Sequence, residues 1–245
     1  MPTELQNYLP MVDLNRHKFF LLQILKDIYS DTLLASTLGF KGGTALMFFY
    51  DLPRFSVDLD FNLISTDNEE VVYEKVRNTL LKYGKIADEA KKFYGPIIVL
   101  DYGLGERKLK VELSTRIFDN RYEIKNFLGI QMKVMAAPDM FAHKICALLD
   151  RSSLTNRDIF DSWYLMQKQT PINTHLVESR MQMPYASYIQ KCIDRLESMS
   201  SKGILHGLGE LMDNEIKSFV KTKLLTETIS LFRIYKDYPI VEGNR

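Results

Sequence analysis

The chain has 245 residues, of which 46% are hydrophobic and 26% are charged, a balance typical of a globular protein with a sizeable core. Its net charge of +1 excludes a strongly basic surface overall, although a local basic patch remains compatible with this balance. The two cysteines, Cys146 and Cys192, are too few for a disulfide framework or a structural zinc site.

The start of the chain and its hydropathy bear on localisation. Residues 1–18 lack the basic, apolar and small-residue order of a signal peptide. No apolar run approaches the ~20 residues that are needed to span a bilayer. We therefore expect a cytoplasmic protein that does not associate with a membrane.

The first elements are helical. Residues 13–29 place apolar side chains at the spacing of an amphipathic helix, and residues 31–38 continue as a second helical piece. Gly42 and Gly43 then allow a sharp backbone turn, since glycine adopts such conformations at low cost. Residues 45–50 follow as a short buried helix that we expect to open at Thr44.

The Gly42-Gly43-Thr44 turn is a candidate phosphate site. At the start of a helix, free backbone N–H groups and the helix dipole favour an anion, and the Thr44 hydroxyl offers a further hydrogen bond to a phosphate oxygen. The alternative is a simple tight turn in which Thr44 is the N-cap of the helix.

The next segment, residues 56–64, alternates between apolar and polar side chains and predicts a half-buried strand. Asp58 and Asp60 fall on its open face, with Ser56 and Asn62. Two residues along a strand advance ~6.8 Å and return to the same face, so both carboxylates can reach a pair of hard cations. Magnesium prefers such oxygen ligands. The alternative is that these acids only solvate the outer face of the strand.

Other residues are candidates for a third metal ligand and for contacts to the triphosphate. Strands at 96–102 and 108–115 are joined by a hairpin loop at 103–106, and Glu112 lies on the polar face of the second strand, beside Lys110. Glu112 is the candidate third metal ligand or, alternatively, part of a surface charge pair. Arg54 and Ser56 precede the two aspartates and are either triphosphate contacts or ordinary loop residues.

The remaining pattern predicts a strand at 130–135, a helix at 138–150, a polar loop at 151–156 and a helix from Arg157 to 168. Strand-like alternation disappears after residue 170, where only helices are expected. A mixed α/β domain at 1–168 followed by a helical bundle at 169–245 is the simplest division.

These motifs together resemble a known family. Gly42-Gly43-Thr44 followed by Arg54-x-Ser56-x-Asp58-x-Asp60 resembles the signature of the polymerase β-like nucleotidyltransferase superfamily. More narrowly, the chain is similar to the AbiEii/AbiGii toxins, which include the MenT toxins. LKVELS at 109–114, PDMFAHKICALLDR at 138–151 and RDIFD at 157–161 support the narrower match, which covers roughly residues 38–165.

The resemblance implies an α+β fold with a mixed sheet, formed by a nucleotidyltransferase domain and a C-terminal helical bundle. Gly43 and Thr44 would hold the nucleotide phosphates, with Thr44 standing where the superfamily often has serine. Asp58 and Asp60 would bind Mg²⁺ or Mn²⁺, with Glu112 as the third ligand.

The resemblance also assigns roles to the later motifs. Lys144 would bind phosphate or position the nucleophile, and Asp161, or its neighbour Asp158, would orient that lysine or the acceptor. Helical spacing places Asp158 and Asp161 on one face. A lysine near two aspartates is equally what a plain inter-helix ion pair looks like.

The expected function is metal-dependent transfer of a nucleotide from an NTP to RNA, with tRNA as the expected acceptor, by the toxin of a toxin–antitoxin or abortive-infection system. A cognate antitoxin is the expected partner. One alternative is nucleotidylation of a small molecule, as in antibiotic-modifying relatives, which requires a closed pocket. An RNA acceptor instead predicts a basic groove, lined by Lys217, Lys221 and Lys223. A non-catalytic binding module is a third possibility, which the intact acids disfavour.

Overall fold

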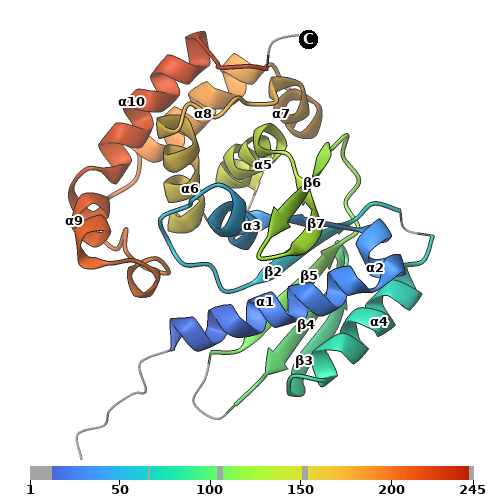
Figure 1. Ribbon diagram of the computed structural model, residues 1–245. Helices are drawn as coiled ribbons and strands as arrows, with labels where there is room; N and C mark the ends of the chain where they lie inside the picture. Colours follow the sequence, from blue (N-terminus) through green and yellow to red (C-terminus); the bar gives the residue numbers. More distant parts are fainter. Residues whose placement is uncertain (1–12, 66, 104–106, 151–153, 243–245) are drawn as a thin grey trace, which may run out of the picture. The chain divides into compact units, whose positions relative to one another are not determined.

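The computed structural model describes residues 13–65, 67–103, 107–150 and 154–242 (Figure 1). The strands are β1 Leu38–Lys41, β2 Leu59–Leu63, β3 Lys85–Lys92, β4 Gly95–Asp101, β5 Leu109–Ser114, β6 Tyr122–Phe127 and β7 Ile130–Met135. The helices are α1 Leu14–Ser30, α2 Thr32–Thr37, α3 Gly42–Phe49, α4 Glu69–Leu81, α5 Ala137–Asp150, α6 Asn156–Gln167, α7 Thr174–Met181, α8 Tyr185–Glu197, α9 Asn214–Thr222 and α10 Leu224–Asp237, with a 3-10 turn η1 at Gly209–Leu211.

The strands form one mixed sheet in the order β3-β4-β5-β2-β1-β7-β6. Strand β2 runs parallel to β5, whereas β4 runs antiparallel to both β3 and β5. The predicted α+β class with a mixed sheet is therefore confirmed. The strands expected at 56–64, 96–102, 108–115 and 130–135 correspond to β2, β4, β5 and β7.

Strand β3 was not expected from the sequence, because its residues KIADEAKK show no apolar alternation. It is an edge strand that pairs along its length with β4, and apart from the half-buried Ile86 its residues are exposed. A strand of this kind is held by backbone hydrogen bonds rather than by a buried face, and its charged side chains protect the edge against pairing with other chains.

The chain divides into two compact units that alternate along the sequence. The first comprises residues 13–40, 57–116 and 126–132, and the second comprises 41–56, 117–125 and 133–242. Strands β2 to β5 lie wholly in the first unit. Strands β1, β6 and β7 contribute residues to both.

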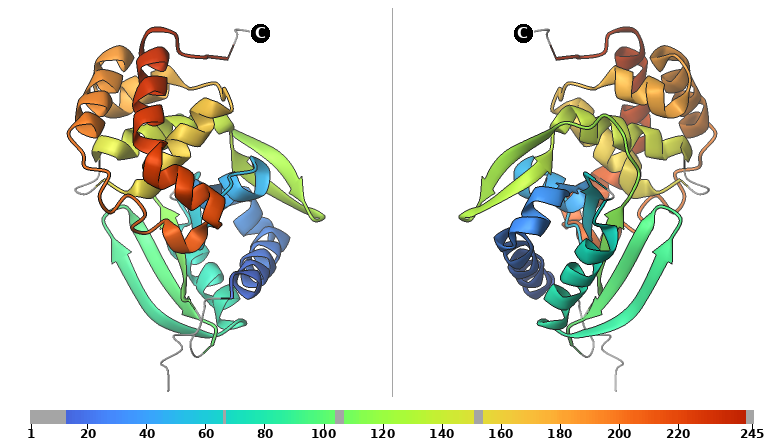
Figure 2. Two further views of the ribbon diagram at one scale, coloured as in Figure 1. Left: turned by 90° about the vertical axis from the view of Figure 1, so that its left-hand side faces the viewer. Right: turned by 90° about the vertical axis from the view of Figure 1, so that its right-hand side faces the viewer.

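In the first unit, α1 packs against α4, which also contacts β3 and β4. Both helices lie on one side of strands β3 to β5 (Figure 2). Asp13 caps α1 by accepting from the N–H groups of Asn15 and Arg16, at 3.0 Å each. Helix α4 buries the face that carries Val72, Val76 and Leu80, as its helical spacing requires.

The second unit is mainly helical. Helix α5 packs against α6 and α7, and α10 packs against α6 and α8. The buried Tyr188 hydroxyl donates to the carbonyls of Ile145 and Cys146, at 3.2 and 2.9 Å, and so ties α8 to α5. The segment predicted as a helical bundle, 169–245, contributes α7 to α10 to this unit. In the part of the chain that the structure describes, no helix combines the length and apolarity that crossing a membrane requires.

Candidate functional site

The glycine turn lies in the second unit, and each of its two positions requires glycine for a different reason. Gly42 has φ +82°, a value that glycine adopts far more readily than other residues. At Gly43 a Cβ atom would lie 2.7 Å from Ser56 Oγ and 2.9 Å from Arg54 Nη2. Both contacts are too short for a carbon atom. Gly43 therefore lets the side chains of Ser56 and Arg54 pack directly over the turn.

Helix α3 begins at Gly42 rather than at Thr44 as expected. Its N-cap is Lys41, which makes no side-chain capping bond, so the interpretation of Thr44 as an N-cap is wrong. The reason is the positive φ of Gly42, which turns the chain into the helix two residues early. Thr44 is consequently in the first turn and is fully buried.

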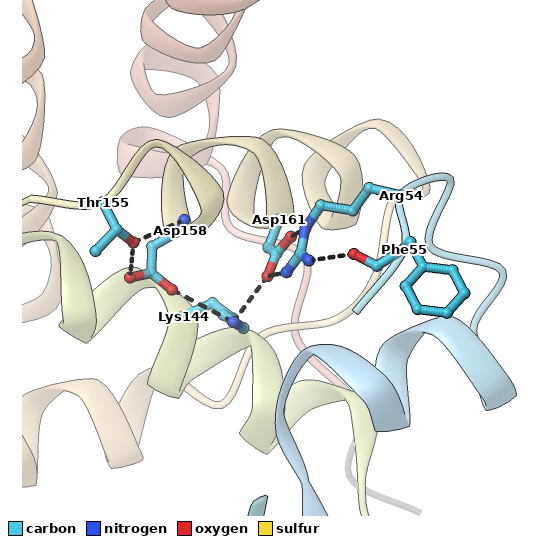
Figure 3. A network of polar contacts seen from close by, with 6 residues as sticks. All are labelled: Arg54, Phe55, Lys144, Thr155, Asp158 and Asp161. Carbon is cyan, nitrogen blue, oxygen red and sulfur yellow. Dashed lines mark hydrogen bonds and ion pairs between the residues drawn. The ribbon is translucent and has the colours of Figure 1, made fainter. Parts of the chain in front are cut away.

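Arg54 and Asp161 form a bidentate ion pair in the second unit (Figure 3). Arg54 Nε donates to Asp161 Oδ1 at 2.6 Å, and Arg54 Nη2 donates to Asp161 Oδ2 at 2.7 Å. The side chains are only 2% and 0% exposed. A third donor, Nη1, bonds the carbonyl of Phe55 at 3.0 Å. Arg54 thus ties the segment that follows α3 to helix α6.

Lys144 on α5 lies between two carboxylates of α6 (Figure 3). Its Nζ is 2.7 Å from Asp161 Oδ2 and 3.3 Å from Asp158 Oδ1. Asp158 is further held by the hydroxyl of Thr155, the N-cap of α6, at 2.6 Å. With 16% of its side chain exposed, Lys144 is the most accessible of these four charged groups.

Asp161 is strongly stabilised as a carboxylate. Burial by itself would raise its pKa, but the positive charges of Arg54 and Lys144 outweigh that effect and lower the pKa from 3.8 to about 2. Two cations face two anions in this network, so its net charge is zero and its members orient one another.

The acidic strands lie in the first unit. In the parallel pairing of β2 with β5, Asp60 is the direct partner of Glu112. Leu59 and Phe61, on either side of Asp60, are fully buried, so the acids occupy the opposite face of the sheet. Asp58 comes immediately before β2 and is 24% exposed. The register thus sets Asp60 beside Glu112, and Asp58 lies one residue before the strand that carries Asp60.

The polar face of β2 is less open than expected. Asn62 and Ser56 are only 3% and 6% exposed. Asn62 pairs in register with Ser114 of β5, which is also buried, so both strands are covered at that end. Only Asp58 and Asp60 of this face remain half-buried.

Lys110 places a cation among the three acids. Its Nζ is 3.3 Å from Glu112 Oε2 and 3.8 Å from Asp58 Oδ2. Burial would lower its pKa, but the charges of Asp60, Asp58 and Glu112 outweigh burial and raise it. Lys110 and Glu112 are two residues apart on β5, and this spacing alone predicts that they share a face of the strand. The position of Lys110 beside Asp58 depends on the pairing of the strands.

The acidic cluster, Asp58, Asp60 and Glu112, has the chemistry of a divalent-cation site. Carboxylate oxygens are the ligands that Mg²⁺ prefers, and the ammonium of Lys110 already stands among them as a positive charge. Across the described ranges, however, no three or more His, Cys, Asp and Glu side chains are arranged closely enough to hold a metal ion. The three carboxylates therefore suit a divalent cation in chemistry and in charge, whereas their spacing in this structure is wider than joint coordination of one ion requires.

His17 supports this cluster from α1 and was not recognised from the sequence. Its ring is fully buried, with Nε2 donating to the carbonyl of Val57 at 2.8 Å and Nδ1 2.5 Å from the Tyr102 hydroxyl. Val57 directly precedes Asp58, so His17 fixes the backbone at the start of the acidic strand. The helical spacing of His17 from Leu14 and Leu21 indicates that it faces inward. Its hydrogen-bond partners, Val57 and Tyr102, could not be predicted because they are distant in the sequence.

The structure thus assembles two sets of the residues that the sequence singled out. The first unit holds the acidic cluster. The second holds the glycine turn and the network of charged groups; its members are Gly42, Gly43, Thr44, Arg54, Ser56, Lys144, Asp158 and Asp161. Arg151, at the end of a motif-bearing segment, lies outside the described residues.

Comparison with known proteins identifies similar sequences and folds. Residues 23–223 match the family described as nucleotidyl transferase AbiEii toxin, type IV toxin–antitoxin system. Among solved structures, JHP933 from Helicobacter pylori is 20% identical with a TM-score of 0.60, covering 91% of this chain and 92% of its own. A Helicobacter pylori protein assigned as a nucleotidyltransferase is also 20% identical, with a TM-score of 0.62 and coverage of 91% and 95%. No curated protein matches the sequence.

Proposed function

Since the chain belongs to the AbiEii nucleotidyl transferase toxin family, we propose that it transfers a nucleotide from an NTP to an RNA acceptor, with tRNA as the expected RNA. Family membership makes the protein a nucleotidyltransferase, and the two Helicobacter pylori structures share its fold. The toxin acts in a toxin–antitoxin or abortive-infection system, and its proposed partner is a cognate antitoxin.

The pairing of Asp60 with Glu112 is the observation on which the catalytic role rests. Together with Asp58, which precedes β2, these carboxylates concentrate three negative charges at two neighbouring strands. Asp58, Asp60 and Glu112 would hold Mg²⁺ or Mn²⁺, which supplies positive charge to the triphosphate and to the departing pyrophosphate. The alternative, a charge pair between Lys110 and Glu112, accounts for the 3.3 Å contact between them but predicts no metal-dependent transfer.

The transfer itself is a displacement at phosphorus. The acceptor hydroxyl oxygen forms a bond to the α-phosphorus, the bond from that phosphorus to the bridging oxygen of the β-phosphate breaks, and pyrophosphate leaves with the electron pair. The proton of the acceptor hydroxyl is released to a carboxylate or to water. The Gly42–Thr44 turn and the Ser56 hydroxyl over it are the groups suited to bind phosphate oxygens.

Lys144 and Arg54 have different roles in this proposal. Lys144 is partly exposed and is oriented by Asp158 and Asp161, so its ammonium is available to a phosphate or to the acceptor. Arg54 is almost fully buried, with three of its N–H donors engaged, which suits it to hold Asp161 rather than to reach a triphosphate. Asp161 then acts by positioning Lys144.

Labelling with each radiolabelled NTP tests the proposal. The protein is incubated with total RNA, with and without Mg²⁺ or Mn²⁺, and compared with Asp60→Asn, which removes a charge at nearly constant volume. We expect metal-dependent label in RNA from the wild type and none from the variant. Label found only in small molecules would support the antibiotic-modifying alternative, and equal labelling by Asp60→Asn would contradict the assigned site.

A further inference from the structure

Lys110 lies beside the carboxylates of the acidic cluster, and the proposed reaction assigns it no role. It lies on β5, two residues before Glu112 and on the same face. Its ammonium is within 3.3 Å of Glu112 Oε2 and 3.8 Å of Asp58 Oδ2. The backbone of β5 pairs with β2 on one side and with β4 on the other, so the lysine stem starts from a rigid strand.

The charges of the cluster determine what this lysine does. Asp58, Asp60 and Glu112 carry three negative charges, and Lys110 places one positive charge among them. Each carboxylate near the ammonium is only 24–27% exposed, so water screens these interactions incompletely. An ammonium and a divalent cation at these oxygens would repel each other, since both seek the same carboxylates.

Resting on the proposed metal role of these acids, we infer that Lys110 is a built-in competitor for the divalent cation, filling the acidic cluster when no metal is bound. Its flexible four-carbon stem and 35% exposure let the ammonium move out into solvent when a metal ion enters. Lys110 therefore weakens metal binding in the free enzyme and stabilises the metal-free fold by offsetting part of the repulsion among the three carboxylates.

Binding of Mn²⁺ alone to the full chain, without nucleotide, tests this inference by calorimetry. Lys110→Met removes the charge but keeps an unbranched side chain, and Lys110→Arg retains the charge. Loss of a unit charge about 4 Å from the ligands should tighten Mn²⁺ binding at least about tenfold in Lys110→Met. Lys110→Arg should bind like the wild type. The melting temperature of Lys110→Met should fall in EDTA and recover at saturating Mn²⁺.

Two further variants separate the possible outcomes. Lys91→Met removes a lysine that pairs with Glu70, outside the cluster, and should leave Mn²⁺ affinity unchanged. Asp60→Asn should lose Mn²⁺ binding. If Asp60→Asn loses binding while Lys110→Met binds no more tightly than the wild type, Lys110 is not a competitor although the metal site stands. If Asp60→Asn binds like the wild type, the metal assignment fails and the inference with it. Should Lys110→Met not fold, Lys110→Gln replaces it.

Discussion

Arg54 and Asp161 are 107 residues apart in the sequence and form a bidentate ion pair that is almost completely shielded from water. Lys144 adds a second cation to the same carboxylate. Asp161 therefore connects the segment after the glycine turn, helix α5 and helix α6. Its position has consequences for stability, for pH dependence and for the role of Lys144.

Asp161→Asn should strongly destabilise the protein. The amide cannot balance the buried guanidinium of Arg54 or the ammonium of Lys144, and an unbalanced buried charge costs about 3–5 kcal/mol. Urea denaturation measures the change in the free energy of unfolding. Asp194→Asn is the control, because Asp194 is exposed on α8 and its loss should cost less than about 0.5 kcal/mol. Similar stabilities of the two variants would show that the buried ion pair contributes little.

Asp161 should also make stability depend on pH in the acid range. Its pKa in the folded protein, about 2, lies below its ordinary value of 3.8, so the ionised group stabilises the fold fully above pH ~4. That contribution, about 2 kcal/mol, is lost as the pH falls through about 2. Denaturation curves at pH values from 7 to 2 should show this loss for the wild type. A variant at Asp161 that retains the same acid-dependent loss would contradict the assignment.

Lys144→Ala should separate a role in the reaction from a structural one. Asp161 keeps its bidentate bond to Arg54 in this variant, but buried Asp158 loses the ammonium of Lys144, so we expect a loss of about 1–3 kcal/mol, smaller than for Asp161→Asn. Nucleotide transfer should fall about 100-fold or more if the ammonium contacts the reacting phosphate. Transfer kinetics and thermal melts are measured on the same preparation. A large loss of stability with unchanged transfer per folded molecule would identify a plain inter-helix ion pair.

Gly43→Ala tests the packing over the glycine turn. The new Cβ would collide with Ser56 Oγ and Arg54 Nη2, and we expect destabilisation of about 1–3 kcal/mol. Adding Ser56→Ala removes the nearer collision and should restore part of the stability. Gly209→Ala is the matched control, since its nearest neighbour, Leu205 Cβ, would be at an ordinary 3.6 Å. Equal effects at Gly43 and Gly209 would show that the turn tolerates a side chain.

Helix α9 offers a test of the RNA acceptor. Lys221 and Lys223 are exposed and Lys217 is half-buried. Reversing these three charges to glutamate should weaken RNA binding and make it less sensitive to salt, because fewer counterions are released. NTP binding should not change. Lys191→Glu, on the exposed surface of α8, is the control. If RNA affinity is the same in both variants, α9 does not contact the acceptor.

Much of the fold could be predicted because its signals are local. The period-2 alternation of β2 and β5 and the apolar stripes of α1 and α4 each depend on residues close in sequence, and the structure confirms them. Strand β3 escaped prediction because nothing in its own residues requires a strand; β4 supplies its hydrogen bonds. The start of α3 was misplaced because the left-handed conformation of Gly42 is set by the surrounding turn.

The sequence by itself determined which chemical groups this protein has and on which kinds of element they lie, since side-chain chemistry and local periodicity are properties of short segments. Only the tertiary structure decided which of them meet. The parallel register sets Asp60 beside Glu112, the pairing of β2 with β5 brings Lys110 to Asp58, and the packing of α5 on α6 gives Asp161 two cations. Such charges act over only a few ångströms, so their effect depends on contacts between segments far apart in the chain.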